Sequence, residues 1–366
     1  MHDDALDVVI TPRPQYMSDG RKRPDIWTKP ANLRDELQGI LGQFPMHRFW
    51  GPMSGIQSSK WIAEASKIVD NEFDPVFSFI YLPHLDYVLQ KRGPADTEGS
   101  VIKELGLIDE VVKDLVGFYE ARGAKVVILS EYGIGNVNEP VHINRVLNQA
   151  GYITTRTERD GLTLDCGSSR AFAIADHQIA MVHVARDADR EPLKKLLQQV
   201  SGIEHVFGKA DAPVWAAGSF HPERAGDLLC IAKRSAWFTY YFWLHDNDAP
   251  DYAGTVAIHD KPGYDPCELL LAYPSWTGEW FGYFNLFARA ILSQICRLRV
   301  LISATPYHEQ ACLSIRGSHG RIDEAIAPIV IFPSLTSKEG IVDSCDIFNI
   351  LLKTVSSENN LDSTAA

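Results

Sequence analysis

The feature that most constrains this chain is the apolar run Val126-Val127-Ile128-Leu129, which ends abruptly in Ser130-Glu131-Tyr132-Gly133. A short run of β-branched and leucine residues that follows a helical stretch and a turn at 122–124 is typical of a parallel strand buried on both faces. In open α/β sheets, ligands bind at the carboxyl ends of such strands. The run therefore predicts an α/β fold that places Glu131 at a functional edge of the sheet.

A second apolar run, residues 76–82, repeats this design and continues into His84 and Asp86. Between the two runs, residues 101–122 have the apolar spacing of a long helix. The whole segment predicts a strand–helix–strand crossover, which should be right-handed. Two strand ends would then present acidic groups, Asp86 and Glu131, at one edge of the sheet.

Length and composition are those of an ordinary globular protein. The chain has 366 residues, of which 45% are hydrophobic and 22% charged, so it can form one large core or two domains. The formal net charge of −12 argues against a nucleic-acid partner, because such binding depends on Lys and Arg contacts to phosphates. A small phosphate ester is not excluded, since a bound cation can reverse the local field.

The cysteines and the apolar runs indicate a cytoplasmic protein. The six cysteines are scattered singly, with no C-x-x-C, which predicts reduced thiols and neither a zinc cluster nor a disulfide framework. No apolar run reaches the ~18 to 20 residues of a membrane span, and the first residues lack the regions of a signal peptide. We therefore expect no membrane partner, and the sequence does not define an oligomeric state.

The remaining segments alternate between helical and strand-like patterns. We expect helices over 31–42, 58–70, 142–150, 191–200 and 284–302, and strands over 170–174, 179–184, 205–207, 228–231 and 329–331. The β-α-β arrangement within 161–244 predicts a small α+β cap. We expect this cap to be inserted into an α/β core formed by 1–160 and 245–350, with a mostly parallel sheet sandwiched by helices. The polar residues 351–366 predict a disordered tail.

Four short motifs follow one another over residues 75–335. They are Asp86-Tyr87-Val88-Leu89-Gln90 with Gly93-Pro94, Ser130-Glu131-Tyr132-Gly133, the segment from His142 to Gly151, and Gly317-Ser318-His319-Gly320. In this order they resemble the nucleotide pyrophosphatase/phosphodiesterase branch of the alkaline phosphatase superfamily. The pattern of that branch is Asp-x-x-x-His with Gly-Pro, a strand ending in Ser-Asp-His-Gly, a short helix leading to Gly-Tyr, and a late Gly-x-His-Gly.

The resemblance implies an alkaline-phosphatase-like fold and a metal-dependent hydrolase of phosphate esters or nucleotides. In that family two divalent ions, usually zinc, lie about 4 Å apart and clamp the attacking and leaving oxygens of an in-line displacement. Carried over, Asp86 and His319 would bind one ion and Glu131 the other, since carboxylate oxygen and imidazole nitrogen both suit zinc. His259, in a second glycine-containing segment, competes with His319 for the same role.

Departures from the pattern keep a second function open. Gln90 and Tyr132 stand where the family has histidines, and Glu131 replaces its aspartate. The first metal-binding Asp of the family and its Thr or Ser nucleophile lie upstream of every aligned residue. We therefore identify no catalytic nucleophile, and the chain is either an N-terminally incomplete member or part of a diverged branch that has lost the standard chemistry. The alternative is a non-catalytic protein that binds nucleotides or phosphate esters on the same fold.

Several candidates also have a purely structural interpretation. Asp86 is suited to cap a helix or a turn, and His319 to form part of an ordinary turn between glycines. Asp176-His177 resembles the Ser-Asp-His motif only superficially, and we expect it to be structural. The aromatic run 237–243 predicts a core or cap interface, although rings beside a phosphoryl site can stack on a nucleobase.

Overall fold

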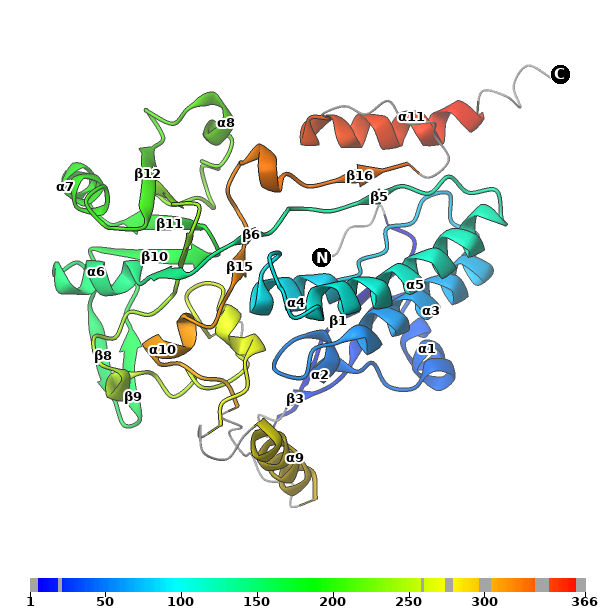
Figure 1. Ribbon diagram of the computed structural model, residues 1–366, viewed down its shortest axis with the longest axis horizontal. Helices are drawn as coiled ribbons and strands as arrows, with labels where there is room; N and C mark the ends of the chain where they lie inside the picture. Colours follow the sequence, from blue (N-terminus) through cyan, green and yellow to red (C-terminus); the bar gives the residue numbers. More distant parts are fainter. Residues whose placement is uncertain are drawn as a thin grey trace.

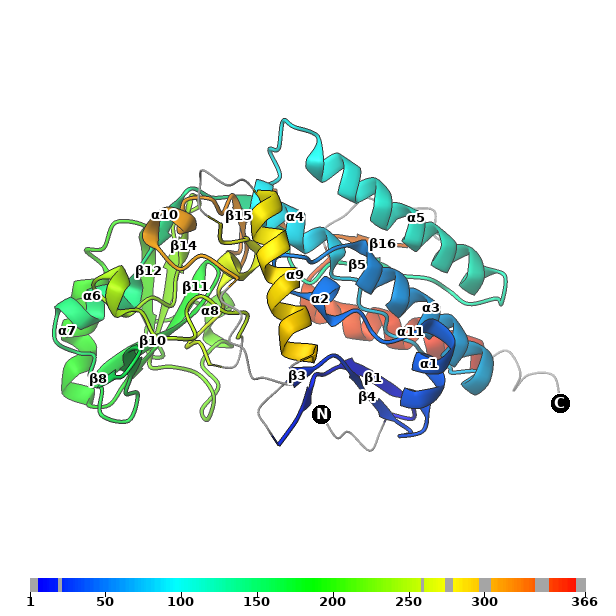
Figure 2. The same ribbon diagram turned by 90° about the horizontal axis from the view of Figure 1, so that it is seen from below.

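The fold was analysed in a computed structural model that describes residues 6–18, 22–257, 260–273, 279–295, 304–332 and 342–359. A helical part and a sheet-rich part lie side by side (Figures 1 and 2). This mixture of helices and strands agrees with the predicted α/β class. Within the described ranges, no helix combines the length and the apolar character that crossing a membrane requires.

The helical part is built mainly by the first third of the chain. Its helices are α1 (Leu33–Leu41), α2 (Met46–Phe49), α3 (Ile56–Phe73), α4 (His84–Arg92) and α5 (Ser100–Glu120). Its first strands are β1 (Val9–Pro12), β2 (Gln15–Tyr16), β3 (Lys22–Arg23) and β4 (Ile26–Lys29), which pair antiparallel as β1–β4 and β2–β3. Leu33 and Leu37 of α1 pack with Trp61 of α3 around Phe44. The helices predicted over 31–42, 58–70 and 101–122 are confirmed, because burial of one apolar face is what their spacing encodes.

The sheet-rich part surrounds a four-stranded antiparallel sheet with the order β10-β11-β13-β12. Its elements are β7 (Glu139–Val141), α6 (Ile143–Gln149), β8 (Thr155–Glu158), β9 (Gly161–Leu164), β10 (Ala171–Asp176), β11 (Ile179–Val184), α7 (Asp187–Leu197), β12 (Ile203–Gly208), α8 (Val214–Ala217), β13 (Leu228–Ala232) and β14 (Ala236–Phe238). All four strands and the two helices predicted within 142–231 are present. Whether 161–244 is an inserted cap stays a prediction.

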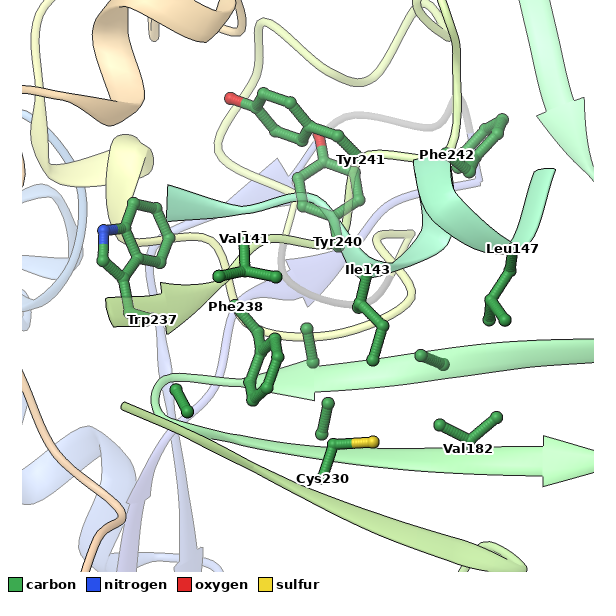
Figure 3. Packing of buried hydrophobic residues seen from close by; sticks show 14 of the residues in the cluster. Val141, Ile143, Leu147, Val182, Cys230, Trp237, Phe238, Tyr240, Tyr241 and Phe242 are labelled. Atoms are coloured by element: carbon green, nitrogen blue, oxygen red, sulfur yellow. The ribbon is translucent and has the colours of Figure 1, made fainter. Parts of the chain in front are cut away.

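The aromatic run 237–243 forms the centre of the largest hydrophobic core. Six of its seven residues are aromatic, and each of these is at most 1% exposed. Phe238 points toward the strands that carry Val182 and Cys230, as do Ile143 and Leu147 of α6 (Figure 3). The run is therefore core, which is one of the two structural roles that its composition predicted.

The last part of the chain returns to both halves of the molecule. Its elements, together with the short strands that precede β7, are β5 (Ile128–Leu129), β6 (Gly135–Asn136), η1 (Asp246–Asp248), η2 (Pro266–Leu269), α9 (Glu279–Ile295), α10 (Glu309–Cys312), β15 (Gly317–Ser318), η3 (Glu324–Ile326), β16 (Val330–Ile331), η4 (Ser344–Asp346) and α11 (Ile347–Asn359). Strand β15 pairs antiparallel with β6, and β16 with β5. These pairings bring the C-terminal segments back beside residues 128–136.

The mostly parallel sheet that we predicted is not found in the described part of the chain. Residues 76–82 are irregular, and the run from Val126 yields only β5, whose Leu129 is 45% exposed. Among the described strand pairs, only β7 with β14 is parallel. The prediction failed because an apolar run forms a strand only where another strand bonds its backbone groups. Periodicity within one segment does not reveal that partner.

Two expectations for the C-terminal region also change. Residues 351–359, which we expected in a disordered tail, form most of α11, while 360–366 lie outside the described residues. The helix predicted over 284–302 is present as α9 up to Ile295, and the rest of that range is likewise not described. The predicted core boundaries at 160 and 245 stay predictions.

We predict that Phe238→Ala lowers the free energy of unfolding by about 3 to 5 kcal/mol, because it removes a fully buried ring and leaves a cavity. The matched control is Phe348→Ala, which removes a ring that is 69% exposed and should change stability by less than about 0.5 kcal/mol. Urea denaturation of both variants measures the difference. Equal losses would contradict the placement of residue 238 in the core.

Candidate functional site

The candidate site lies where the helical and sheet-rich parts meet, around α4, β6 and β15 (Figures 1 and 2). The backbone N–H of Arg316 donates to the carbonyl oxygen of Gln90 at 2.9 Å. A Cβ atom on Gly317 would lie only 2.1 Å from the carbonyl oxygen of Leu89, so this close approach requires glycine. β15 therefore delivers His319 to the helix that carries Asp86.

Hydrogen bonds hold Asp86 from two sides. Gln90 is one turn further along α4, on the same face, and its Nε2 donates to Asp86 Oδ2 at 2.7 Å. The Tyr132 hydroxyl donates to Asp86 Oδ1 at 3.2 Å. At its other end, the amide oxygen of Gln90 accepts from the hydroxyl of Tyr264 at 3.0 Å.

Ring contacts continue from Tyr132 back to Tyr264. The Tyr132 ring stacks on the His319 imidazole, with centroids 3.5 Å apart and planes 6° from parallel. His319 and His177 have centroids 3.7 Å apart, and His177 and Tyr264 have centroids 4.0 Å apart. The contacts thus close on themselves. We call these side chains the six-residue network: Asp86, Gln90, Tyr264, His177, His319 and Tyr132.

Burial sets the protonation of this network. Burial raises the pKa of Asp86 above its usual range, and the charge of Glu131 acts in the same direction, whereas the hydrogen bonds from Gln90 and Tyr132 oppose them. Burial lowers the pKa of His319 to about 4 and that of His177 well below its usual value. At neutral pH the network therefore consists of one carboxyl group among uncharged partners.

A buried ion group supports the segment that carries Tyr264. Lys261 Nζ lies 2.7 Å from both Asp265 Oδ2 and Glu268 Oε1, and all three side chains are at most 2% exposed. Trp50 Nε1 donates to Glu268 Oε2 at 2.5 Å, and the Trp50 ring packs against Tyr264. Because every charge is paired, the group is compatible with burial.

Of the four predicted metal ligands, the structure brings Asp86 and His319 together through Tyr132. Glu131 is exposed, and its negative charge helps to raise the pKa of Asp86. His259 lies outside the described residues. Their metal-binding roles stay predictions.

The donor set does not fit the predicted two-ion centre as it is arranged. Both oxygens of Asp86 already accept hydrogen bonds, and the side chains at the family's histidine positions, 90 and 132, are an amide and a phenol. Within the described ranges, no three or more His, Cys, Asp or Glu side chains are grouped so as to hold a metal ion. Zinc sites in proteins usually have three or four protein ligands.

Sequence reasoning missed two members of the network, His177 and Tyr264. His177 occupies the turn between β10 and β11 with φ of 56°, a region that few residues other than glycine adopt. The backbone N–H of Gln178 donates to the His319 carbonyl at 2.8 Å, which ties this turn to the Gly-Ser-His-Gly segment. The sequence predicts Asp176-His177 to be structural because it lies in the predicted cap, and nothing in the sequence indicates the pairing of this turn with residue 319.

A hydroxyl group also lies near His177. Ser318 Oγ is 3.4 Å from His177 Nδ1. The Ser318 residue is only 1% exposed, so its hydroxyl is closed to an external substrate. We therefore assign Ser318 to the packing of the turn and do not identify it as a nucleophile.

We predict that Lys261→Met destabilises the protein by about 3 to 5 kcal/mol, because it leaves two buried carboxylates without their cation. The double variant Lys261→Met with Glu268→Gln should recover part of this loss, since one of those charges is then removed. Urea denaturation of the single and double variants measures both effects. A single variant within about 1 kcal/mol of the parent would refute the proposed pairing.

Two kinds of solved structure are similar to parts of this chain. Phosphonoacetate hydrolase from Sinorhizobium meliloti, in complex with phosphonoacetate, is 16% identical with a TM-score of 0.40, over 57% of this chain and 48% of that chain. Murine ectonucleotide pyrophosphatase / phosphodiesterase 5 is 12% identical with a TM-score of 0.30, over 42% and 36% of the two chains. The present chain spans about half or less of the length of these proteins.

The strongest comparison is at the level of sequence families. No curated protein matches the chain. The sequence profile described as type I phosphodiesterase / nucleotide pyrophosphatase matches residues 6–265, which is more than half of the 366 residues. The chain therefore belongs to the type I phosphodiesterase / nucleotide pyrophosphatase family, within the alkaline phosphatase superfamily, as the order of its motifs predicted.

Proposed function

We propose that this chain is a hydrolase of small phosphate esters or nucleotides and that its reaction site is the six-residue network. Family membership supports the reaction class. Two contacts of Tyr132 support this location. Its hydroxyl donates to Asp86 Oδ1 at 3.2 Å, and its ring centroid lies 3.5 Å from that of His319. These residues come from three motifs that are far apart in the sequence.

The chemistry of the network suits proton transfer. A carboxyl group with a raised pKa exchanges a proton closer to neutral pH, as a general acid or base must. The hydrogen bonds of Gln90 and Tyr132 orient Asp86 for this role. His319 is partly exposed and uncharged, so its imidazole can accept a proton or a hydrogen bond from a bound substrate.

The family relationship predicts a divalent metal ion as cofactor, with zinc as the first candidate. Because the donor set does not fit a two-ion centre, no step of the proposed reaction is assigned to an ion. The cytoplasmic location also stays a prediction, as does the expected absence of nucleic-acid and membrane partners. We assign no nucleophile.

We predict that the protein hydrolyses an aryl phosphodiester such as bis-p-nitrophenyl phosphate. Asp86→Asn and His319→Ala should each lower kcat/KM by about 100-fold or more, because each removes a side chain that can act as a general acid or base. The control Glu110→Gln changes an exposed carboxylate on α5 and should retain full activity. Assays with EDTA, zinc and manganese measure any metal requirement separately.

The alternative function makes a different prediction. A non-catalytic binding protein would show no turnover under any of these conditions, while AMP would raise its Tm by mass action. Loss of that Tm shift in His319→Ala would then place the binding site at the same network. Steady turnover that both site variants abolish would eliminate this alternative.

A further inference from the structure

We infer that Gln90, Tyr132 and Tyr264 are positioning residues that organise this site by direct contacts, and that the site holds no resident divalent metal ion. The inference concerns the site of the proposed function but does not require that the protein hydrolyse anything. It follows from the disagreement between the arrangement of the side chains and a two-ion centre. Three observations carry it.

The first observation is the orientation of Gln90. Its side chain is fully buried, its amide oxygen accepts from Tyr264 at 3.0 Å, and its amide nitrogen donates to Asp86 at 2.7 Å. The oxygen is the atom of an amide that can bind a metal ion, and here it faces away from Asp86. Reversing the amide would place that oxygen against the Asp86 carboxylate, which is unfavourable. Gln90 therefore presents donor hydrogens to Asp86, and not its metal-binding oxygen.

The second observation is that one side chain connects the two predicted ligands. The Tyr132 hydroxyl donates to Asp86, while its ring covers the imidazole of His319 with nearly parallel planes. A neutral phenol is a hydrogen-bond donor to a carboxylate. Together with Gln90, it supplies the half-buried carboxylate of Asp86 with two hydrogen-bond donors.

The third observation is that protein groups contact both the ring and the backbone of His319. Its ring contacts Tyr132 and His177, and its carbonyl oxygen accepts from the backbone N–H of Gln178 at 2.8 Å. In zinc proteins, the metal and a second hydrogen-bond partner usually orient the imidazole. Here stacking on Tyr132 orients the ring, and the hydrogen bond from Gln178 holds the backbone of His319. Among the described residues, Asp86 and His319 belong to no group of three or more His, Cys, Asp or Glu side chains that could hold a metal ion.

The direct test counts metal in the full chain. Protein incubated with excess zinc or manganese and then desalted should contain fewer than about 0.1 ions per chain by elemental analysis, and its Tm should not change on addition of EDTA. The control Glu110→Gln should give the same values. One or more ions per chain that are lost in Asp86→Asn or His319→Ala would overturn the inference.

A second measurement tests positioning by Tyr132. In protein labelled at histidine, the Cε1–H resonance of His319, identified by its loss in His319→Gln, should shift in Tyr132→Leu, which removes the stacked ring. Tyr132→Phe keeps the ring and should leave that resonance nearly in place, while lowering Tm through loss of the hydroxyl. One equivalent of zinc should not move the resonance in the parent. A shift of the His319 resonance at one equivalent of zinc would contradict the inference. The same resonance position in the parent, Tyr132→Leu and Tyr132→Phe would also contradict it.

These outcomes are independent of turnover. The protein could show no hydrolysis, contain no metal, and still show the expected shift of the His319 resonance in Tyr132→Leu. That result would refute the proposed function and leave the inferred organisation of the site intact. Hydrolysis that requires one ion per chain, with that ion lost in Asp86→Asn, would support the proposed function and refute the inference of a site without metal.

Discussion

The position of the site depends on how closely Gly317 approaches the backbone of α4. Any side chain at residue 317 would meet the carbonyl oxygen of Leu89, because even a Cβ atom would lie 2.1 Å from it. The neighbouring hydrogen bond from Arg316 to Gln90 fixes the register of the two segments. His319 follows two residues later and lies against Tyr132 as a result. Glycine at one position thus decides whether the late motif meets the early one.

The polar network is stable because each of its buried groups has a partner. A buried amide is costly unless both of its ends are hydrogen-bonded, and Gln90 meets this condition between Asp86 and Tyr264. Tyr264 is held by the Trp50 ring and by the segment that the Lys261 ion group anchors. Fully satisfied networks of this kind rigidify their surroundings. The arrangement joins the helical part, the sheet-rich part and the C-terminal segments at one point.

Local patterns predicted the helices better than the sheet. The spacing of Leu33 and Leu37, or of Ile108 and Leu115, indicates one buried face, because helical hydrogen bonds are made within the segment. The strand expected over 76–82 has no such internal support, and its residues are irregular. β11 was predicted with its correct bounds. It was recognisable as a short run of mostly apolar residues, although its antiparallel neighbours were not.

What the linear order determined by itself was the family, and it also supplied the candidate site residues, whose roles stay predictions. Asp86, Tyr132 and His319 lie in motifs whose order is a property of the chain and is readable before folding. Only the tertiary structure decided that His177 and Tyr264 complete their surroundings, and that Gln90 faces Asp86 with a donor. The physical reason is that ring stacking and side-chain hydrogen bonds between distant segments depend on how close the backbones come. No short-range pattern encodes that distance.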